Sequence, residues 1–281
     1  MKYITRGSYS KIFLLSKNNK FYIVKKVKKN KDNLNEIKMY KYLNHRNIVK
    51  IYDYYVKNNY YHIVLEHMNM GDMDNIISSD NIYNILLQIT NGIKFIHDNN
   101  IIHRDIKPSN ILINSNGNIK ITDFGISKKL SKYYNKTFTH IGTKQYMAPE
   151  MYTEYGYTYN IDYWSLGCTI YKFLTGKTLY DYNNYFELYH MVCCSKLQLN
   201  VDKPYNYLLK GLLNKNYYKR YNYKHIYIFL RRNYKKRNVI NNIIKTNTLF
   251  SPKLKKLGLP ITISKKPKKV LYDNVVLLKL K

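Results

Sequence analysis

The sequence predicts an α+β fold with two lobes, in which a small strand-rich N-terminal lobe precedes a larger helical one. Runs of β-branched and aromatic residues dominate the chain before Glu66, whereas apolar residues spaced three and four apart dominate it after Gly71. The chain has 281 residues, of which 45% are hydrophobic, so it is long enough to bury a core in each lobe. We therefore expect the lobes to join at residues 66–71.

Two strands open the predicted N-terminal lobe. Residues 11–15 (KIFLL) and 21–27 (FYIVKKV) are rich in β-branched and aromatic side chains, and the turn-like segment SKNNK separates them. Successive side chains of a strand point to opposite faces, so Lys25 and Lys26 are expected to diverge.

One helix and two further strands complete this lobe. Residues 33–43 have helical spacing, with Glu36 and Tyr40 on the same face. The runs 48–56 and 60–68 return to the strand pattern. The lobe is therefore expected to hold a single main helix beside a sheet.

The pattern of the C-terminal lobe is helical. Residues 81–98 form a long amphipathic segment, and residues 161–176 and 185–194 are predicted to be further helices. Between the first two of these segments lie short apolar runs broken by polar motifs, which are the candidates for chemistry.

The formal net charge of +31 is unusually basic. Lys, Asn, Tyr and Ile occur throughout the chain and share A/T-rich codons, so a biased genome, such as that of a virus or a reduced parasite, accounts for much of the lysine. However, no acidic residue lies between Asp202 and Asp273. A basic C-terminal extension over residues 233–281 is therefore expected to attract nucleic acid or acidic partners, with residues 253–269 as its core.

Cysteine content and hydropathy predict an intracellular protein. Cys168, Cys193 and Cys194 provide no disulfide framework, which is typical of a reducing compartment. We find no apolar run long enough to cross a bilayer and no signal-peptide pattern. The expected location is the cytoplasm or the nucleus, within a host cell if the chain is viral. The histidines show no metal-binding spacing.

Two segments carry the residues that phosphoryl transfer requires: IIHRDIKPSNILI, residues 101–113, and IKITDFGIS, residues 119–127. Asp105 can accept the proton of an attacking hydroxyl, and Lys107 can reach the moving phosphoryl group. Asn110 and Asp123 offer oxygen ligands suited to Mg²⁺. The turn NSNGN between the segments is expected to bring these two ligands to neighbouring strand ends.

With these motifs the sequence resembles the eukaryotic protein kinases. Residues 103–110 match the catalytic-loop pattern, residues 123–125 the Asp-Phe-Gly motif and residues 148–150 the Ala-Pro-Glu motif, in the family's order and spacing from residue 4 to about residue 230. The resemblance implies a bilobal protein kinase fold over residues 1–232. Its N-lobe would cover residues 1–67, its hinge residues 66–71 and its C-lobe residues 72–232, with ATP and Mg²⁺ as cofactors and a protein as substrate.

The resemblance also implies roles for residues of the cleft. Asp105, Lys107, Arg104 and Thr143 would form the catalytic group, with Asn110 and Asp123 as metal ligands. In the N-lobe, Lys25 would grip the nucleotide phosphates and pair with Glu36. Leu65 would close the back of the adenine pocket, and the backbone from Glu66 to Met68 would bind the base.

The nucleotide-covering loop departs from the family pattern. It corresponds to Ile4, Thr5, Arg6, Gly7, Ser8, Tyr9, Ser10, Lys11 and Ile12. Gly7 is kept at the closest approach to the phosphates, while Thr5 and Ser10 replace two further glycines and Tyr9 keeps the aromatic tip. Ile23 replaces the usual alanine over the adenine. We expect ATP binding weakened by ~1–2 kcal/mol but retained.

Substrate and regulation also follow from the resemblance. Lys107 and Thr143 are typical of Ser/Thr kinases. In local sequence the chain most resembles the MAP kinase kinases of the STE group, which accept both Thr and Tyr. The first predicted strand begins almost at residue 1, without a docking segment of their kind, so plain Ser/Thr specificity is expected. Arg104 indicates control by phosphorylation, because its cation can pair with a phosphate on the following loop. Thr139 is the first candidate for the phosphorylated residue, and Thr137 is the second.

Four residues are expected to have structural roles. Glu150 and Arg220 match a buried ion pair, and Asp162 and Trp164 match a helix that anchors the catalytic loop. The alternative to an active enzyme is a pseudokinase, a degenerate kinase fold that serves as a basic binding module for nucleic acid or an anionic scaffold. The intact charged groups of the cleft favour the active enzyme.

Overall fold

The computed structural model describes residues 1–6, 10–74, 82–131 and 136–241, with side chains described up to Asn233. The loop residues Gly7, Ser8 and Tyr9 lie outside the described residues, as does the basic segment 253–269. The expectations that concern them therefore stay predictions.

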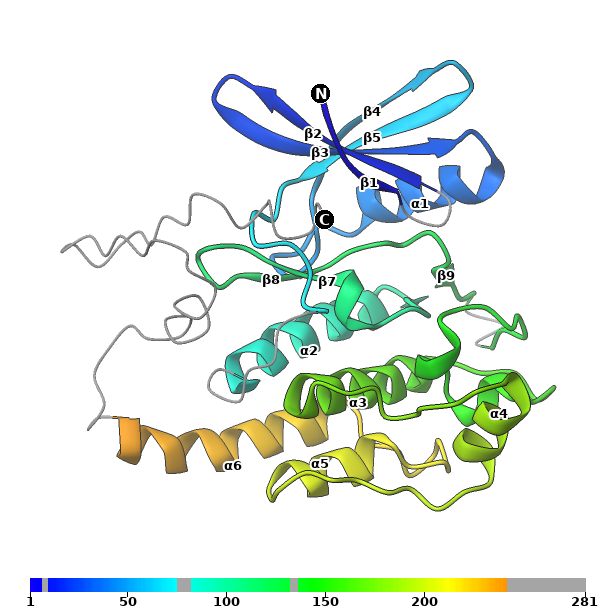
Figure 1. The fold of residues 1–281 in the computed structure, drawn as a ribbon, viewed down its shortest axis with the longest axis vertical. Coiled ribbons are helices and arrows are strands. Elements are labelled where there is room, and N and C mark those ends of the chain that lie inside the picture. Colours follow the sequence, from blue (N-terminus) through cyan, green and yellow to red (C-terminus); the bar gives the residue numbers. More distant parts are fainter. Residues whose placement is uncertain (7–9, 75–81, 132–135, 242–281) are drawn as a thin grey trace.

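A five-stranded antiparallel sheet forms the N-terminal lobe (Figure 1). Its strands lie in the order β1-β2-β3-β5-β4 and are β1 (Lys2–Arg6), β2 (Ser10–Lys17), β3 (Lys20–Lys28), β4 (Ile51–Lys57) and β5 (Tyr60–Glu66). Both hairpins turn on a pair of asparagines, Asn18-Asn19 and Asn58-Asn59, whose φ values between 50° and 61° suit tight two-residue turns. The sequence therefore fixes the register of these hairpins locally.

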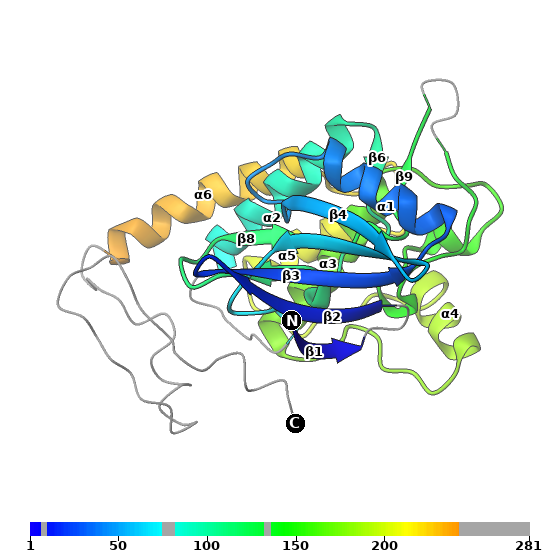
Figure 2. The same cartoon turned by 90° about the horizontal axis from the view of Figure 1, so that it is seen from above.

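Helix α1 (Lys31–Tyr42) lies beside the sheet, as the view from above shows (Figure 2). Asn30 caps the start of the helix, because its side chain accepts a hydrogen bond from the backbone N–H of Asn33 at 2.8 Å. Its buried face carries Glu36, Ile37 and Tyr40. The expected face is therefore confirmed, and it carries an acid toward the interior.

The C-terminal lobe is helical and lies below the sheet in Figure 1. Its helices are α2 (Ile82–Asp98), α3 (Asn160–Thr175), α4 (Tyr185–Cys193), α5 (Tyr205–Leu212) and α6 (Tyr223–Asn241). Two short strand pairs lie between α2 and α3: β6 (Ile101–Ile102) with β9 (Lys128–Lys129), and β7 (Ile111–Ile113) with β8 (Ile119–Ile121). A short 3₁₀ turn, η1 (Pro108–Asn110), precedes β7, and two more, η2 (Lys144–Tyr146) and η3 (Pro149–Tyr152), lie between β9 and α3.

This architecture confirms the predicted α+β class with its strand-rich first lobe and helical second lobe. The predicted helices agree with α1 to α4 within a few residues, and Gly176 ends α3 with a φ of 76°. Helices α5 and α6 are not among those that the sequence pattern predicts. Helix α6 runs across the predicted domain end at residue 232, so the start of the basic extension stays a prediction.

The hairpin β7–β8 is held beneath the N-terminal lobe by backbone hydrogen bonds. The N–H of Val49 donates to the carbonyl of Ile121 at 3.0 Å, and the N–H of Ile121 donates to Asn47 at 2.9 Å. Gly92 of α2 allows this approach, because a Cβ there would lie 2.8 Å from Ile121 Cδ1 and 3.0 Å from the Asn47 carbonyl. The residues that follow β8 are thereby fixed between the lobes.

No helix in the described part of the chain is long and apolar enough to cross a membrane. The long α2 is instead amphipathic, and its buried face carries Ile85, Ile89, Ile93 and Ile96.

The burial of α2 predicts the effect of shortening its side chains. Ile89 is 0% exposed, whereas Leu87 on the same helix is 39% exposed. Ile89→Ala should lower the free energy of unfolding by about 2–5 kcal/mol, because it leaves a cavity in the core. The matched Leu87→Ala should stay within about 0.5 kcal/mol of the original chain. Equal losses for both variants, measured by urea denaturation, would contradict this packing.

Candidate active site

The loop between β6 and β7 is held by a buried carboxylate from α3. Asp162 is 0% exposed and accepts hydrogen bonds from the backbone N–H groups of His103 and Arg104, each at 2.9 Å. It also contacts His97 Nε2 at 2.7 Å. Burial alone would raise the pKa of Asp162, but these partners outweigh it and lower the pKa. The loop can therefore keep Arg104 at a φ of 70°.

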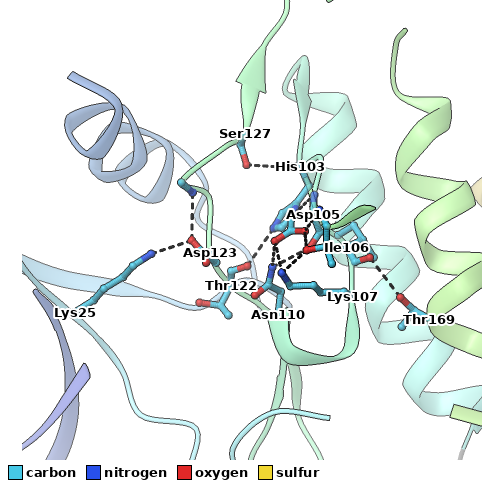
Figure 3. Close-up of polar contacts among 12 residues, drawn as sticks. Lys25, His103, Asp105, Ile106, Lys107, Asn110, Thr122, Asp123, Ser127 and Thr169 are labelled. Carbon is cyan, nitrogen blue, oxygen red and sulfur yellow. Dashed lines mark hydrogen bonds and ion pairs between the residues drawn. The ribbon is translucent and has the colours of Figure 1, made fainter. Parts of the chain in front are cut away.

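Neighbouring side chains orient both carboxylate oxygens of Asp105, and Figure 3 shows two of them, Lys107 and Asn110. Oδ1 accepts two hydrogen bonds from Thr143, one from the hydroxyl at 2.7 Å and one from the backbone N–H at 3.2 Å. Oδ2 lies 2.8 Å from Lys107 Nζ and accepts Asn110 Nδ2 at 2.8 Å. The ammonium of Lys107 also donates to Thr143 Oγ1 at 2.6 Å. Of the catalytic group expected from the sequence, Lys107 and Thr143 thus contact this carboxylate, whereas the Arg104 guanidinium donates to Ile126 and Thr139 instead.

His103 fixes the backbone of this loop rather than offering a free base. Its Nε2 lies 3.1 Å from the carbonyl of Thr122, which can only accept, so the ring proton is on Nε2. Nδ1 then accepts the N–H of Asp105 at 3.2 Å. The ring packs edge-on against Phe124 with centroids 5.0 Å apart.

The N-terminal lobe contributes a lysine with two carboxylate partners. Lys25 Nζ lies 2.6 Å from Glu36 Oε1 and 2.8 Å from Asp123 Oδ1, the second contact being drawn in Figure 3. Burial would lower the pKa of Lys25, but the two carboxylates outweigh it and raise the pKa. On the opposite face of β3, Lys26 Nζ lies 4.4 Å over the ring of Tyr60. The strand alternation thus separates the two lysines as expected.

The direction of Asp123 is set by Tyr40, which sequence reasoning placed only on the buried face of a helix. The Tyr40 hydroxyl accepts the N–H of Asp123 at 2.9 Å and lies 3.0 Å from Thr122 Oγ1. Its ring meets Phe124 edge-on at 5.1 Å, so Phe124 is packed between Tyr40 and His103. A buried tyrosine hydroxyl needs a hydrogen-bond partner. A tyrosine on the buried face of the predicted helix therefore indicates a polar contact at this point, although the sequence does not name the partner.

Two oxygens remain for a cation beside Asp105. Asn110 uses only its amide nitrogen toward Asp105, which leaves Oδ1, while Asp123 uses Oδ1 toward Lys25 and Gly125, which leaves Oδ2. Hairpin β7–β8 brings the two residues together, since the N–H of Thr122 donates to the carbonyl of Asn110 at 3.0 Å. An amide and a carboxylate oxygen fit Mg²⁺.

These two ligands would need others from a bound molecule. Among the described residues, no three His, Cys, Asp or Glu side chains gather in a way that could hold a metal ion. Mg²⁺ commonly binds one or two carboxylates together with phosphate oxygens, so the donor set suits a magnesium–nucleotide complex.

The nucleotide side of the cleft is partly described. Ile4, Thr5 and Arg6 lie on β1, and Ser10, Lys11 and Ile12 on β2, with Thr5 paired to Ile12 and Arg6 to Lys11. The expected adenine-pocket residues lie on adjacent strands, where Ile23 pairs with Leu65 and Leu65 is buried.

Two backbone groups in the connection between the lobes are hydrogen-bonded within the protein. The N–H of Glu66 already donates to the carbonyl of Lys50 at 2.9 Å, and the Glu66 side chain lies 2.9 Å from Lys120 Nζ. The carbonyl of Met68 accepts the N–H of Gly71 at 3.0 Å. Backbone contacts of residues 66–68 with a base would therefore use groups other than the Glu66 N–H, and they stay a prediction.

The two expected phosphorylation acceptors differ in access. Thr139 is exposed, and its Oγ1 accepts a hydrogen bond from Arg104 Nη1 at 2.6 Å. Thr137 is 6% exposed, and its backbone is bonded in both directions to Tyr157 at 3.0 and 2.9 Å. Access thus favours Thr139.

A buried ion pair joins the end of this segment to the helical lobe. Arg220 donates to Glu150 through both terminal nitrogens, with Nη2 2.8 Å from Oε2. Arg220 also donates to the carbonyls of Asn160 and Asn214, each at 3.0 Å, and its guanidinium lies 5.1 Å over the ring of Trp164. The structure thus brings together the pair expected from the sequence.

Comparisons with known proteins agree with this geometry. Residues 1–229 match the family model described as "Protein kinase domain". The chain is 36% identical over 154 residues to the "Serine/threonine-protein kinase PLK4" of Xenopus tropicalis, covering 52% of this chain and 16% of that protein. It is 35% identical over 233 residues to the "Calcium-dependent protein kinase 6" of Plasmodium berghei, covering 76% of this chain and 16% of that protein.

A further relative is the human "Mitogen-activated protein kinase kinase kinase 5", at 42% identity over 154 residues, with 50% of this chain and 11% of that protein covered. The chain thus spans only a small fraction of the length of these relatives.

The contact of Asp123 with Lys25 predicts a specific pH dependence of stability. Burial would raise the pKa of Asp123, but Lys25 outweighs it and lowers the pKa from 3.8 to about 2. The stabilisation is therefore complete above pH 3.8 and is lost as the pH falls through about 2. The difference in unfolding free energy between the original chain and Asp123→Asn should be constant above that range and shrink within it.

Chemical denaturation across this range measures the difference. Asp98→Asn is the matched control, since the Asp98 side chain is 54% exposed and pairs with Lys94 at the surface. A difference that grows as the pH falls would contradict the assignment.

Proposed function

The chain belongs to the protein kinase family, and we propose that it transfers the γ-phosphoryl group of Mg-ATP to serine and threonine hydroxyls of proteins. The observation that carries this proposal is the double contact of Lys25 with Glu36 and Asp123. It links the nucleotide-binding lobe to a metal-binding carboxylate across the cleft, and the family's chemistry requires both of these groups in place.

Asp105 acts as the base in this proposal. Thr143 and Lys107 hold its carboxylate at hydrogen-bonding distance, so that an oxygen can face the attacking hydroxyl and accept its proton. Lys107 lies beside the same point and offsets negative charge on the transferred group. The position of Thr143 between Lys107 and Asp105 supports the serine and threonine specificity expected from the sequence.

Asn110 and Asp123 would hold Mg²⁺, which neutralises phosphate charge when bound. Lys25 orients the α- and β-phosphates, and Glu36 holds Lys25 in the required rotamer. Each of these residues acts by positioning, because phosphoryl transfer needs little covalent help from the protein.

A catalytically idle binding module is the competing function. Such a module would have no need to keep a nearly buried lysine paired with a buried glutamate, an arrangement that is expensive to desolvate. The intact pair therefore supports the active enzyme.

Phosphotransfer from radiolabelled ATP to basic and acidic proteins tests the proposal. Asp105→Asn should lower the rate by about 10²–10⁴-fold, because the amide keeps the shape of the side chain but cannot accept the proton. Asp98→Asn makes the same chemical change at the surface and should keep the original rate. Incorporation that survives in Asp105→Asn would refute the role of Asp105.

We further propose that phosphorylation of Thr139 activates the enzyme. A phosphate on this exposed hydroxyl would lie against Arg104, which already contacts it, and would order the segment that carries Thr143. Thr139→Ala should lower kcat/KM by about 5- to 150-fold, the usual range of such coupling. Thr178→Ala, at a half-buried threonine after α3, controls for loss of a threonine elsewhere. Active enzyme without phosphate at Thr139 by mass spectrometry would contradict this proposal.

A further inference from the structure

Among the described residues, Lys144 is a lysine without an ion-pair partner beside the proposed catalytic group. Lys144 follows Thr143, whose hydroxyl binds Asp105 at 2.7 Å. Lys144 is exposed, and in the described part of the chain its ammonium is in no ion pair. This sets it apart from its neighbours Lys107 and Lys172, whose ammonium groups contact Asp105 and Asp74.

Aromatic side chains hold Lys144 in place without neutralising it. Its Nζ lies 4.9 Å over the ring of Tyr185, and its carbonyl accepts the hydroxyl of Tyr152 at 3.3 Å. Tyr152 in turn packs against Tyr185 and Tyr189, with centroids 6.0 and 5.7 Å apart. A cation over an aromatic face keeps its full charge, so Lys144 is oriented and still able to bind an anion.

One acid near this site, Asp74, is already paired with a lysine. Asp74 Oδ1 lies 2.7 Å from Lys172 Nζ on α3. Lys172 lies less than one turn beyond Thr169, whose hydroxyl donates to the carbonyl of Ile106 next to Asp105. The N–H of Met73 also donates to the carbonyl of Pro108 at 3.2 Å, so the neighbouring Asp74 lies beside the loop that carries Lys107. A cationic side chain arriving here would find this carboxylate occupied.

From these contacts we propose that Lys144 selects acceptors in which the serine or threonine is flanked by an anionic residue. The proposal rests on the proposed kinase activity and names its substrate class. The anion is the carboxylate of Asp or Glu or the phosphate of a phosphorylated residue. A basic flank is disfavoured, because it would meet the charge of Lys144 and find Asp74 paired.

Peptides that differ only in the residues flanking one serine test this selectivity. Each flanking position carries Asp, phosphoserine, Ala or Arg in turn, and kcat/KM is measured for every peptide. At the favoured position, Asp should exceed Ala by about fivefold, the upper end of an exposed ion pair, and phosphoserine should exceed Asp because of its larger charge. The preference should shrink as salt is added.

Variants of Lys144 assign the preference to this side chain. Lys144→Gln should abolish the preference for the acidic peptide, and Lys144→Glu should turn it into a preference for the Arg peptide. Lys210→Glu makes the same charge change on the exposed face of α5 and should leave the ranking of peptides unchanged. A ranking that is the same in the original chain and in Lys144→Glu would overturn the proposal.

The two proposals can fail separately. Transfer to all peptides at equal kcat/KM would overturn the selectivity and leave the kinase activity standing. Absence of transfer to any peptide would count against the kinase activity. In that case fluorescence anisotropy of the same peptides still decides the inference. Tighter binding of the acidic peptides that Lys144→Glu abolishes would support it, and equal affinities would overturn it.

Discussion

The site depends on the ion pair between Lys25 and the buried Glu36, in which one of the two carboxylate oxygens lacks a hydrogen-bond donor among the described residues. Glu36 is 1% exposed and gives Oε1 to Lys25, while Oε2 has no hydrogen-bond partner among the described residues. A buried carboxylate oxygen without a donor is destabilising by roughly 1–3 kcal/mol. The fold retains this arrangement because β3, α1 and the segment after β8 must meet at one point between the lobes. The contact of Lys25 with Asp123 makes that meeting point a charged one.

The helical lobe supports the same site from below by a second buried charge. Asp162 accepts the backbone N–H groups of both His103 and Arg104. The ring of His103 in turn accepts the N–H of Asp105, so the position of Asp105 depends on the same loop. The reacting side chains are thus carried by short loops whose positions are determined by a strand pair and a core helix. Rigid elements place the groups, and loops present them to the substrate.

Much of this site could be predicted from sequence because its motifs are local. The spacing from Asp105 to Asn110 and the Asn-rich turn before Asp123 determine a hairpin, and strand alternation separates Lys25 from Lys26. The rest depends on contacts between distant segments. The hydroxyl of Tyr40 accepts a hydrogen bond from the N–H of Asp123, 83 positions away. The N–H of Glu66 donates to the carbonyl of Lys50. Neither interaction has a signature within one segment, because each depends on how the lobes pack.

The stacking of Arg220 over Trp164 has a spectroscopic consequence. Trp164 is the only tryptophan in the 281-residue sequence and is 0% exposed in the centre of the helical lobe. Intrinsic indole emission from this protein therefore reports solvent entry into the helical C-terminal lobe and does not respond to unfolding of the N-terminal lobe alone. Fluorescence and circular dichroism together would reveal whether the two halves unfold as a single cooperative unit.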